Sequence, residues 1–317
     1  MITIKNLSKE FKLSKEQRKE QATDRKFTRA VNDLNFSCKP GEVYSLLGPN
    51  GAGKTTTLRM LATILKPTSG RIEVCGIDAV KHPREARMKI GFLTGSTGLY
   101  ARLTANEIID YFGSLYSVSS NTLKERKAYL YDLLDMNGFA NKRIGQLSTG
   151  MKQKVSICRT MIHDPEILIL DEPTNGLDPQ GIHEIREIIR TIATNGTTIL
   201  LASHLLDEVE KVCSHVVVIR EGIKLYSGTV DEMTSSYGLF ELKTDTNSEK
   251  LLELLLTYEG ITSTKIDDDR IIATLNKAIT ASELNQFLYE NGIILSHLVK
   301  RKPSLEQQFL SLTNNKS

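Results

Sequence analysis

The sequence has no tryptophan, few cysteines and no long apolar run. Its cysteines, Cys38, Cys75, Cys158 and Cys213, are widely spaced and form no C-x-x-C pair, so we expect buried, reduced thiols rather than disulfides or a metal site. This cysteine usage favours the cytosol. The longest apolar runs, such as residues 167–170, are far shorter than the roughly 20 residues that a membrane-spanning helix needs. The N-terminus also lacks the apolar segment of a signal peptide, so we expect a soluble chain.

The charge is nearly balanced and excludes no compartment by itself. Lys plus Arg number 41 and Asp plus Glu 38, which gives a net charge of +3 and no general attraction to nucleic acid. We therefore expect no nucleic-acid partner. Acidic and basic residues are interleaved in residues 12–29, a pattern that predicts a surface loop or a short polar helix. A basic patch for anionic lipid is the weaker alternative there.

Residues 30–228 alternate short apolar runs with helical patterns, and the chain of 317 residues is long enough for a second domain. Strands are predicted at residues 2–7, 88–93, 166–170, 197–202 and 216–219. Helices are predicted at residues 104–116, 124–134, 152–162 and 181–194, the first with a cap at Thr104 and Glu107. Continuously apolar strands separated by helices indicate an α/β fold whose largely parallel sheet is covered on both faces.

The pattern changes near residue 235. Strands are predicted at residues 239–244, 261–266, 270–275 and 293–299, helices at 249–257 and 281–291, and a last helix at 304–312. The order βαββαβ is that of a small α+β, ferredoxin-like unit. We therefore predict a separate C-terminal accessory domain over residues 239–317, with a linker at about 234–238. Whether it stabilises an assembly or regulates it is left open.

The segment Gly48 to Thr55 fits the pattern G-x-x-x-x-G-K-[ST] between a strand-like and a helix-like run. In that setting the pattern predicts a phosphate-binding loop, because glycines let backbone N–H groups turn around an anion at a helix N-terminus. Lys54 can reach the β- and γ-phosphates, and the Thr55 hydroxyl can coordinate Mg²⁺. The predicted nucleotide-binding residues here are Gly48, Pro49, Asn50, Gly51, Ala52, Gly53, Lys54, Thr55 and Thr56.

Asp171 and Glu172 follow the apolar run 167–170. A carboxylate at the exit of a buried strand is the second half of many phosphate-loop sites, so we expect Asp171 to hold Mg²⁺ through water. If the strand continues, Glu172 points to its other side and faces a water in line with the γ-phosphate. Glu172 is therefore predicted to act as a general base or to orient that water.

The order of motifs resembles that of ABC-transporter ATPases. The segment Leu147–Met151 is similar to the LSGGQ signature, residues 171–174 to the segment with the catalytic Glu, residues 176–178 to the D-loop, and His204 to the switch histidine. The resemblance covers the first 230 or so residues and implies a P-loop NTPase cassette over residues 1–234: a mostly parallel core sheet, additional antiparallel strands and a helical subdomain at about 95–162. The short signature, residues 95–100 and the long N-terminal loop look most like the Nat-type, sodium-extrusion branch, with the drug-exporter branch next.

In such a family two subunits pack head to tail, with ATP between one phosphate loop and the other signature. The resemblance implies that Ser148 and the Gly150 N–H bind the γ-phosphate held by the other subunit, and that Asp178 communicates across the interface. His204 would bond the γ-phosphate and orient the attacking water. The adenine would stack on Phe11, with Phe27 as the alternative, because stacking needs only a flat aromatic face.

Three positions depart from the family pattern. Gly95 stands where the family usually has a glutamine that meets Mg²⁺, so Thr94, Ser96 or a water would replace that ligand and hydrolysis would be slower or more partner-dependent. Thr149 and Met151 replace a glycine and a glutamine of the signature. Since Ser148 and Gly150 are retained, we expect both changes to be tolerated.

The resemblance implies an ATP-hydrolysing subunit that powers export, of Na⁺ or of a drug- or lipid-like compound, from the cytoplasmic face of the cell membrane. Its implied partners are a polytopic permease, docked at residues 99–104, and a second ATPase subunit, identical or not. One alternative is a soluble ABC ATPase acting on ribosomes or DNA, which a single phosphate loop and the lack of heptads disfavour. The other is a module that binds ATP without hydrolysis, which Glu172 and His204 disfavour.

Overall fold

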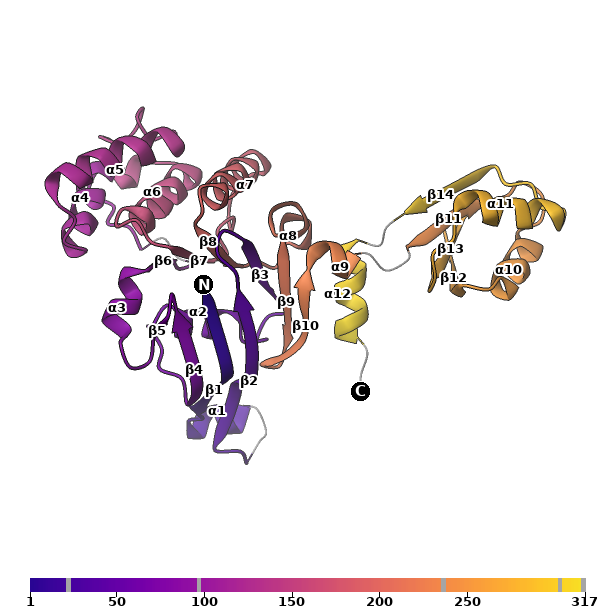
Figure 1. The fold of residues 1–317 in the computed structure, drawn as a ribbon, viewed down its shortest axis with the longest axis horizontal. Coiled ribbons are helices and arrows are strands. Elements are labelled where there is room, and N and C mark those ends of the chain that lie inside the picture. The colour runs from indigo at the N-terminus through magenta and orange to yellow at the C-terminus, as the bar shows by residue number, and fades with distance from the viewer. Residues whose placement is uncertain (21–23, 96–97, 235–237, 302–303, 315–317) are drawn as a thin grey trace. The chain divides into compact units, whose positions relative to one another are not determined.

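The computed structural model describes residues 1–20, 24–95, 98–234, 238–301 and 304–314, which form two compact units, Met1–Gly228 and Thr229–Ser317 (Figure 1). None of the helices within these ranges is long and apolar enough to cross a membrane.

A six-stranded sheet in the order β10-β9-β3-β8-β7-β6 forms the centre of the first unit. Its strands are β3 (Val43–Leu47), β6 (Ile90–Leu93), β7 (Ile167–Asp171), β8 (Thr198–Ala202), β9 (His215–Arg220) and β10 (Ile223–Thr229). The pairs β6–β7, β7–β8, β3–β8 and β3–β9 are parallel, so the ends of β3, β7 and β8 meet at one edge. Every residue of β3, β7 and β8 is buried, as expected for parallel strands covered on both faces.

A smaller antiparallel sheet has the order β2-β1-β4-β5. Its strands are β1 (Ile2–Lys12), β2 (Phe27–Cys38), β4 (Ser69–Val74) and β5 (Ile77–Asp78). The first strand continues past the predicted end at residue 7, because its charged residues pair with the start of β2, as far as Lys12 with Phe27. Of the two alternatives for the charged stretch, the polar helix is present as α1 (Lys15–Glu20).

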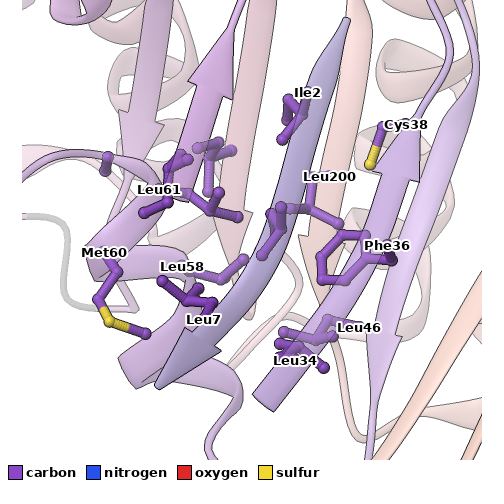
Figure 2. Packing of buried hydrophobic residues seen from close by; sticks show 14 of the residues in the cluster. Ile2, Leu7, Leu34, Phe36, Cys38, Leu46, Leu58, Met60, Leu61 and Leu200 are labelled. Atoms are coloured by element: carbon purple, nitrogen blue, oxygen red, sulfur yellow. The ribbon is translucent and has the colours of Figure 1, made fainter. Parts of the chain in front are cut away.

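The helix α2 (Lys54–Leu61) packs into the hydrophobic core that both sheets share. Figure 2 shows Leu58 and Leu61 of α2 beside Leu7 of β1, with Leu46 and Leu200 of the parallel sheet in the same cluster. Leu58 and Leu61 are fully buried. This packing fixes the helix N-terminus relative to the end of β3, so the loop between them is held at both ends.

Helices α4 (Ala105–Leu115), α5 (Ser120–Leu133) and α6 (Thr149–Met161) pack on one another (Figure 1). The predicted capping box at Thr104 and Glu107 is confirmed. Several predicted bounds differ from the structure. Residue 88 ends α3 (Pro83–Met88), whose start the proline favours, and not a strand. The helix expected from residue 152 begins at Thr149, because Ser148 caps it.

The remaining elements of the first unit are η1 (Ile144–Gln146), α7 (Pro179–Thr194) and α8 (Leu206–Val212). Helix α7 begins at Pro179, before the predicted residue 181, with Asp178 as its cap. It contacts β8 and α8. Thus α7 and α8 both lie next to the strand that precedes His204.

The second unit contains the predicted βαββαβ order. Its elements are α9 (Val230–Thr234), β11 (Leu239–Lys243), α10 (Ser248–Thr257), β12 (Ile261–Asp267), β13 (Arg270–Leu275), α11 (Ala281–Glu290), β14 (His297–Arg301) and α12 (Leu305–Asn314). The antiparallel sheet has the order β12-β13-β11-β14. Its core is built around Phe240, which is fully buried. The last strand was predicted too early, because Ile293 is buried in this core ahead of the strand. Helix α9 contacts α12 and belongs to this unit, and most of the expected linker lies outside the described residues.

Candidate nucleotide-binding site

The phosphate loop connects β3 to α2, and its backbone conformation depends on glycine. Gly53 caps α2 with a left-handed φ of 100°, and a Cβ atom there would lie 2.3 Å from the carbonyl oxygen of Ala30. A larger residue would therefore open the loop. The backbone N–H groups of the first turn of α2 have no helical partner, and this N-terminus is a place for an anion.

Lys54 is folded back into this loop. Its Nζ donates to the carbonyl oxygens of Gly48 at 2.6 Å and Pro49 at 3.2 Å. Burial lowers the pKa of Lys54, and the carboxylates of Glu172 and Asp171 oppose that shift. The ammonium group thus lies inside the loop and donates to carbonyl oxygens, whereas a phosphate would be a stronger acceptor.

Thr55 and Asp171 meet across the sheet edge. The Thr55 hydroxyl donates to Asp171 Oδ1 at 3.2 Å, although the two residues are 116 positions apart in sequence. Asp171 is the last residue of β7 and is buried. Burial raises the pKa of this carboxyl, while the Thr55 hydrogen bond lowers it. A hydroxyl and a carboxylate oxygen in contact are the ligand types that Mg²⁺ takes, so the residues fit the predicted ion.

Glu172 and His204 form a pair beside this site. His204 Nδ1 lies 2.7 Å from Glu172 Oε2, and since an ionised carboxylate only accepts, Nδ1 is the donor. The expectation that the strand continues through Glu172 was wrong, because Glu172 has a left-handed φ of 52°. Its N–H still donates to the carbonyl oxygen of Ala202 on β8. The chain turns at Glu172, and this turn brings the carboxylate next to His204 after β8.

Gln153 supports the same turn and was not predicted from the sequence. Its Nε2 donates to the carbonyl oxygen of Pro173 at 2.6 Å, and the side chain is buried. Helix α6, which starts at the signature-like segment, is thereby joined to the residue after Glu172. A polar residue on the buried side of a helix was the available signal, but only the structure shows its partner.

Ser148 and Asp178 line a second site, separate from the phosphate loop. Ser148 caps α6 by accepting from the Met151 N–H at 3.2 Å, and Asp178 caps α7 by accepting from the Gly181 N–H at 2.9 Å. Both, with Gly150, line an open groove of about 720 Å³ whose described lining contains no residue of the phosphate loop. Thr149 has no left-handed backbone angle, since it is the first residue of α6, so its backbone does not require the glycine that it replaces.

The structure separates the two aromatic candidates for adenine. Phe27, with Thr28 and Arg29, lines an open hollow of about 680 Å³ that includes Gly51 of the phosphate loop. Phe11 is not among the lining residues, and the Lys9 ammonium lies 5.2 Å from its ring centroid. Phe11 pairs with Thr28 across the β1–β2 hairpin, and successive side chains of a strand point to opposite faces, so Phe11 and Phe27 lie on opposite faces of the hairpin.

Comparison with known proteins assigns the family. The model of the family described as ABC transporter matches residues 31–175. The ABC transporter ATP-binding protein NatA of Bacillus subtilis is 41% identical over 237 residues, which cover 74% of this chain and 92% of that protein. The chain belongs to the ABC-transporter ATPases. The bacitracin transport ATP-binding protein BcrA of Bacillus licheniformis is 36% identical to this ATPase over 90% of the chain and 92% of that protein.

Solved structures agree with this assignment. An ATP-binding subunit of an ABC transporter superposes with a TM-score of 0.63 at 27% identity, covering 75% of this chain and 93% of that one. A dimeric ATP-binding cassette in a post-hydrolysis state with ADP and Pi has a TM-score of 0.63 at 25% identity, covering 72% and 98%. The predicted family, the P-loop cassette fold and the ATPase activity are confirmed. This ATPase binds ATP, and cassettes of its family dimerise and serve membrane permeases.

Gly95, where the family glutamine is expected, follows β6 in this ATPase and is exposed. A Cβ atom at Gly95 would lie 3.6 Å from the Asp171 carbonyl oxygen, so the backbone here passes close to the end of β7. Thr94, one of the suggested substitutes for the glutamine, precedes it, whereas Ser96 lies outside the described residues. The slower or partner-dependent hydrolysis expected from this change stays a prediction.

Proposed function

We propose that this ATPase hydrolyses MgATP between two cassette subunits and powers export through a separate permease. The observation that carries the proposal is the division of the predicted residues into two groups. Lys54, Thr55, Asp171, Glu172 and His204 lie around the ends of β3, β7 and β8. Ser148, Gly150 and Asp178 line the separate groove at α6 and α7. A second subunit, of the same or a different chain, would supply the missing group to each site.

The first group is proposed to bind the nucleotide. The N–H groups of the loop Gly48–Thr56 and the Lys54 ammonium hold the phosphates, and Thr55 and Asp171 hold Mg²⁺. When bound, Mg²⁺ neutralises charge on the phosphate oxygens. In this arrangement Lys54 exchanges its carbonyl acceptors for phosphate oxygens, which are stronger partners for an ammonium.

Glu172 and His204 are proposed to act on the attacking water. The Glu172 carboxylate takes a proton from that water, and the bond from His204 Nδ1 holds the carboxylate in place. With Nδ1 donating to Glu172, Nε2 can donate to the γ-phosphate only when the His204 ring carries both protons. Both side chains are partly exposed, 21% for Glu172 and 54% for His204, so a second subunit is needed to shield the pair from solvent.

The second group is proposed to complete the opposite site. Ser148 and the Gly150 N–H, at the N-terminus of α6, bind the γ-phosphate held by the other subunit, and Asp178 lies across the interface. ATP favours the closed dimer because only there does it contact both subunits, and its loss on hydrolysis shifts the population back to the open state.

The permease is proposed to dock between the helices α4–α6 and the parallel sheet. A groove of about 280 Å³ there is lined by Phe92 of β6, Phe112 of α4, Tyr116 just after α4, and Arg159 of α6. The segment 99–104, proposed as the other part of this surface, leads directly into α4 and exposes Tyr100. This docking would hold the ATPase at the cytoplasmic face of the cell membrane.

The direction and cargo are proposed from the relatives. Their names include bacitracin transport, daunorubicin resistance and Nod factor export, in addition to NatA. We infer export of Na⁺ or of a drug- or lipid-like compound. Residues 1–234 are proposed as the nucleotide-binding domain, with its helical subdomain at about 95–162. The βαββαβ unit within 239–317 is proposed as an accessory domain that stabilises or regulates the dimer.

Phe27 is proposed to stack on the adenine in place of Phe11. We expect Phe27→Ala to weaken ATP binding about tenfold, since stacking of a base on an aromatic ring contributes about 1–3 kcal/mol. Phe11→Ala is the matched control and is expected to change the Kd less than twofold. Titration with a fluorescent ATP analogue, competed by ATP and by inorganic triphosphate, measures both. Equal losses of ATP affinity in the two variants, or a larger loss in Phe11→Ala, would contradict stacking of the adenine on Phe27 alone and favour Phe11.

The proposed function as a whole is tested by what co-purifies with the tagged chain from gently solubilised membranes of its native cell. A polytopic membrane protein in stoichiometric amount is expected, and its retention should be lost in Phe112→Asp, which places a charge in the proposed docking groove. Lys265→Asp, on an exposed strand of the second unit, is the control. Recovery of ribosomal or DNA-associated proteins without a membrane subunit would contradict the proposal.

A further inference from the structure

Helix α8 begins two residues after His204 and has little stability of its own. It spans only Leu206–Val212, and its N-cap residue Leu205 makes no side-chain cap. Helices this short are not stable in isolation, because nucleation is costly and few hydrogen bonds follow. Its position, and with it the direction from which the chain leaves His204, is therefore set by tertiary contacts.

The strongest of these contacts is a forked ion pair with α7. Arg186 Nε donates to Glu208 Oε2 at 3.1 Å, and Arg186 Nη2 donates to Glu208 Oε1 at 2.7 Å. Both side chains are only 15% exposed. Two parallel hydrogen bonds between planar groups fix distance and orientation together, which a single ammonium contact does not.

A second arginine of α7 holds the other end of the same helix. Arg190, one turn after Arg186, donates through Nη2 to the carbonyl oxygen of Lys211 in the last turn of α8. Carbonyls in a last helical turn have no partner within the helix, so this bond fills an open position. Helix α8 is thus attached to α7 near both ends, and a movement of α7 must move α8.

The ion pair lies next to the catalytic pair and not at the surface. Arg186 and Glu208 line one small cavity together with Pro173, the residue after Glu172, and Ser203, the residue before His204. Asp178, proposed to lie across the dimer interface, caps the N-terminus of α7. From Asp178 the path runs along α7 and across the ion pair to α8, which the chain joins to His204 through Leu205.

We propose that Arg186 is a positioning residue for hydrolysis. It acts through Glu208 and helix α8 to keep His204 within hydrogen-bonding distance of Glu172. This inference rests on the proposed roles of His204 and Glu172. In Arg186→Met the Glu208 carboxylate keeps its partly buried position without its cation, so α8 is expected to shift. The phosphate loop is built on β3 and α2, which the change does not touch.

Turnover and substrate affinity should therefore respond differently. For Arg186→Met of the full-length chain we expect kcat for ATP hydrolysis to fall about tenfold and KM for ATP to change less than threefold. Arg186→Lys should lie between this variant and the unchanged chain, because lysine keeps the charge but cannot form the fork. Phosphate release over a range of ATP concentrations measures both parameters.

The matched control is Arg126→Met. Arg126 is similarly enclosed, at 20% exposed, and its guanidinium pairs with Asp164 at 3.0 Å and donates to the Met161 carbonyl oxygen at 2.9 Å. Its loss should lower the Tm about as much as Arg186→Met but leave kcat within twofold. An equal loss of kcat in the control would overturn the proposal, because general destabilisation would then explain both.

The decisive variant combines Arg186→Met with His204→Ala. If Arg186 acts through His204, the double variant should turn over no more slowly than His204→Ala alone, within about twofold, since effects through one residue do not multiply. A further tenfold loss in the double variant would overturn the proposal and leave the role of His204 intact. Full turnover of His204→Ala by itself would instead refute the proposed role of His204.

Discussion

Glu172→Gln is expected to reduce ATP hydrolysis at least about 100-fold while ATP still binds, because an amide cannot accept the proton that a positioned general base takes, a contribution of about 10²–10⁴-fold. Glutamine has the same size, and its oxygen can still accept from His204 Nδ1, so the 2.7 Å contact need not break. The change therefore removes the general base but keeps the contact with His204.

The measurement is phosphate release by the full-length chain, together with its affinity for ATP. Glu166→Gln is the control: its carboxylate is exposed and pairs with Lys89 at 2.6 Å, outside the site. We also expect the Glu172→Gln chain to stay dimeric in MgATP for longer, since hydrolysis is what reopens the closed state. A variant that hydrolyses ATP at the normal rate would exclude Glu172 as the base.

Lys54→Met should have the second largest effect and should act on binding. The Lys54 ammonium is the charged group inside the phosphate loop, and hydrogen bonds to charged groups contribute about 1.5–3 kcal/mol each. Loss of two such bonds to phosphate raises the Kd for ATP about 100-fold or more. Calorimetric titration with MgATP measures this loss directly.

The stability of the nucleotide-free chain separates this effect from misfolding. Burial lowers the pKa of Lys54, which shows that the folded state disfavours its charge. Methionine has a similar length and no charge to desolvate, so the Tm without ATP should be unchanged or higher. Lys89→Met, at an exposed lysine, should leave the Kd within twofold. Retention of ordinary ATP affinity in Lys54→Met would refute the phosphate-loop assignment.

Much of the fold could be predicted because its signals are local. The buried strands contain continuous apolar runs at 167–170 and 199–202, and the capping box of Thr104 and Glu107 marks the start of α4. The βαββαβ order of the second unit follows from alternating patterns of the same kind. Among the bounds that failed, that of β14 lies where burial of a single residue, Ile293, decides the outcome and periodicity does not.

The site residues could be predicted where the chemistry depends on short sequence segments. The phosphate loop needs glycines and a lysine at fixed spacing, and a carboxylate at a strand end suits a metal, so the sequence by itself determined the nucleotide chemistry and the family. Thr55 and Asp171 could each be named in this way. Their 3.2 Å contact could not, since it depends on the strand order β3-β8-β7.

Only the tertiary structure decided which residues meet. The chain turns at Glu172 toward His204, and Gln153 bonds to Pro173. Phe27, and not Phe11, lines the hollow beside the phosphate loop. The ion pair of Arg186 and Glu208 joins α8 to α7. The physical reason is that each of these arrangements is set by strand order, strand pairing or helix packing. A local pattern fixes the residue types and the elements that carry them, whereas distances between elements follow from how the shared core packs.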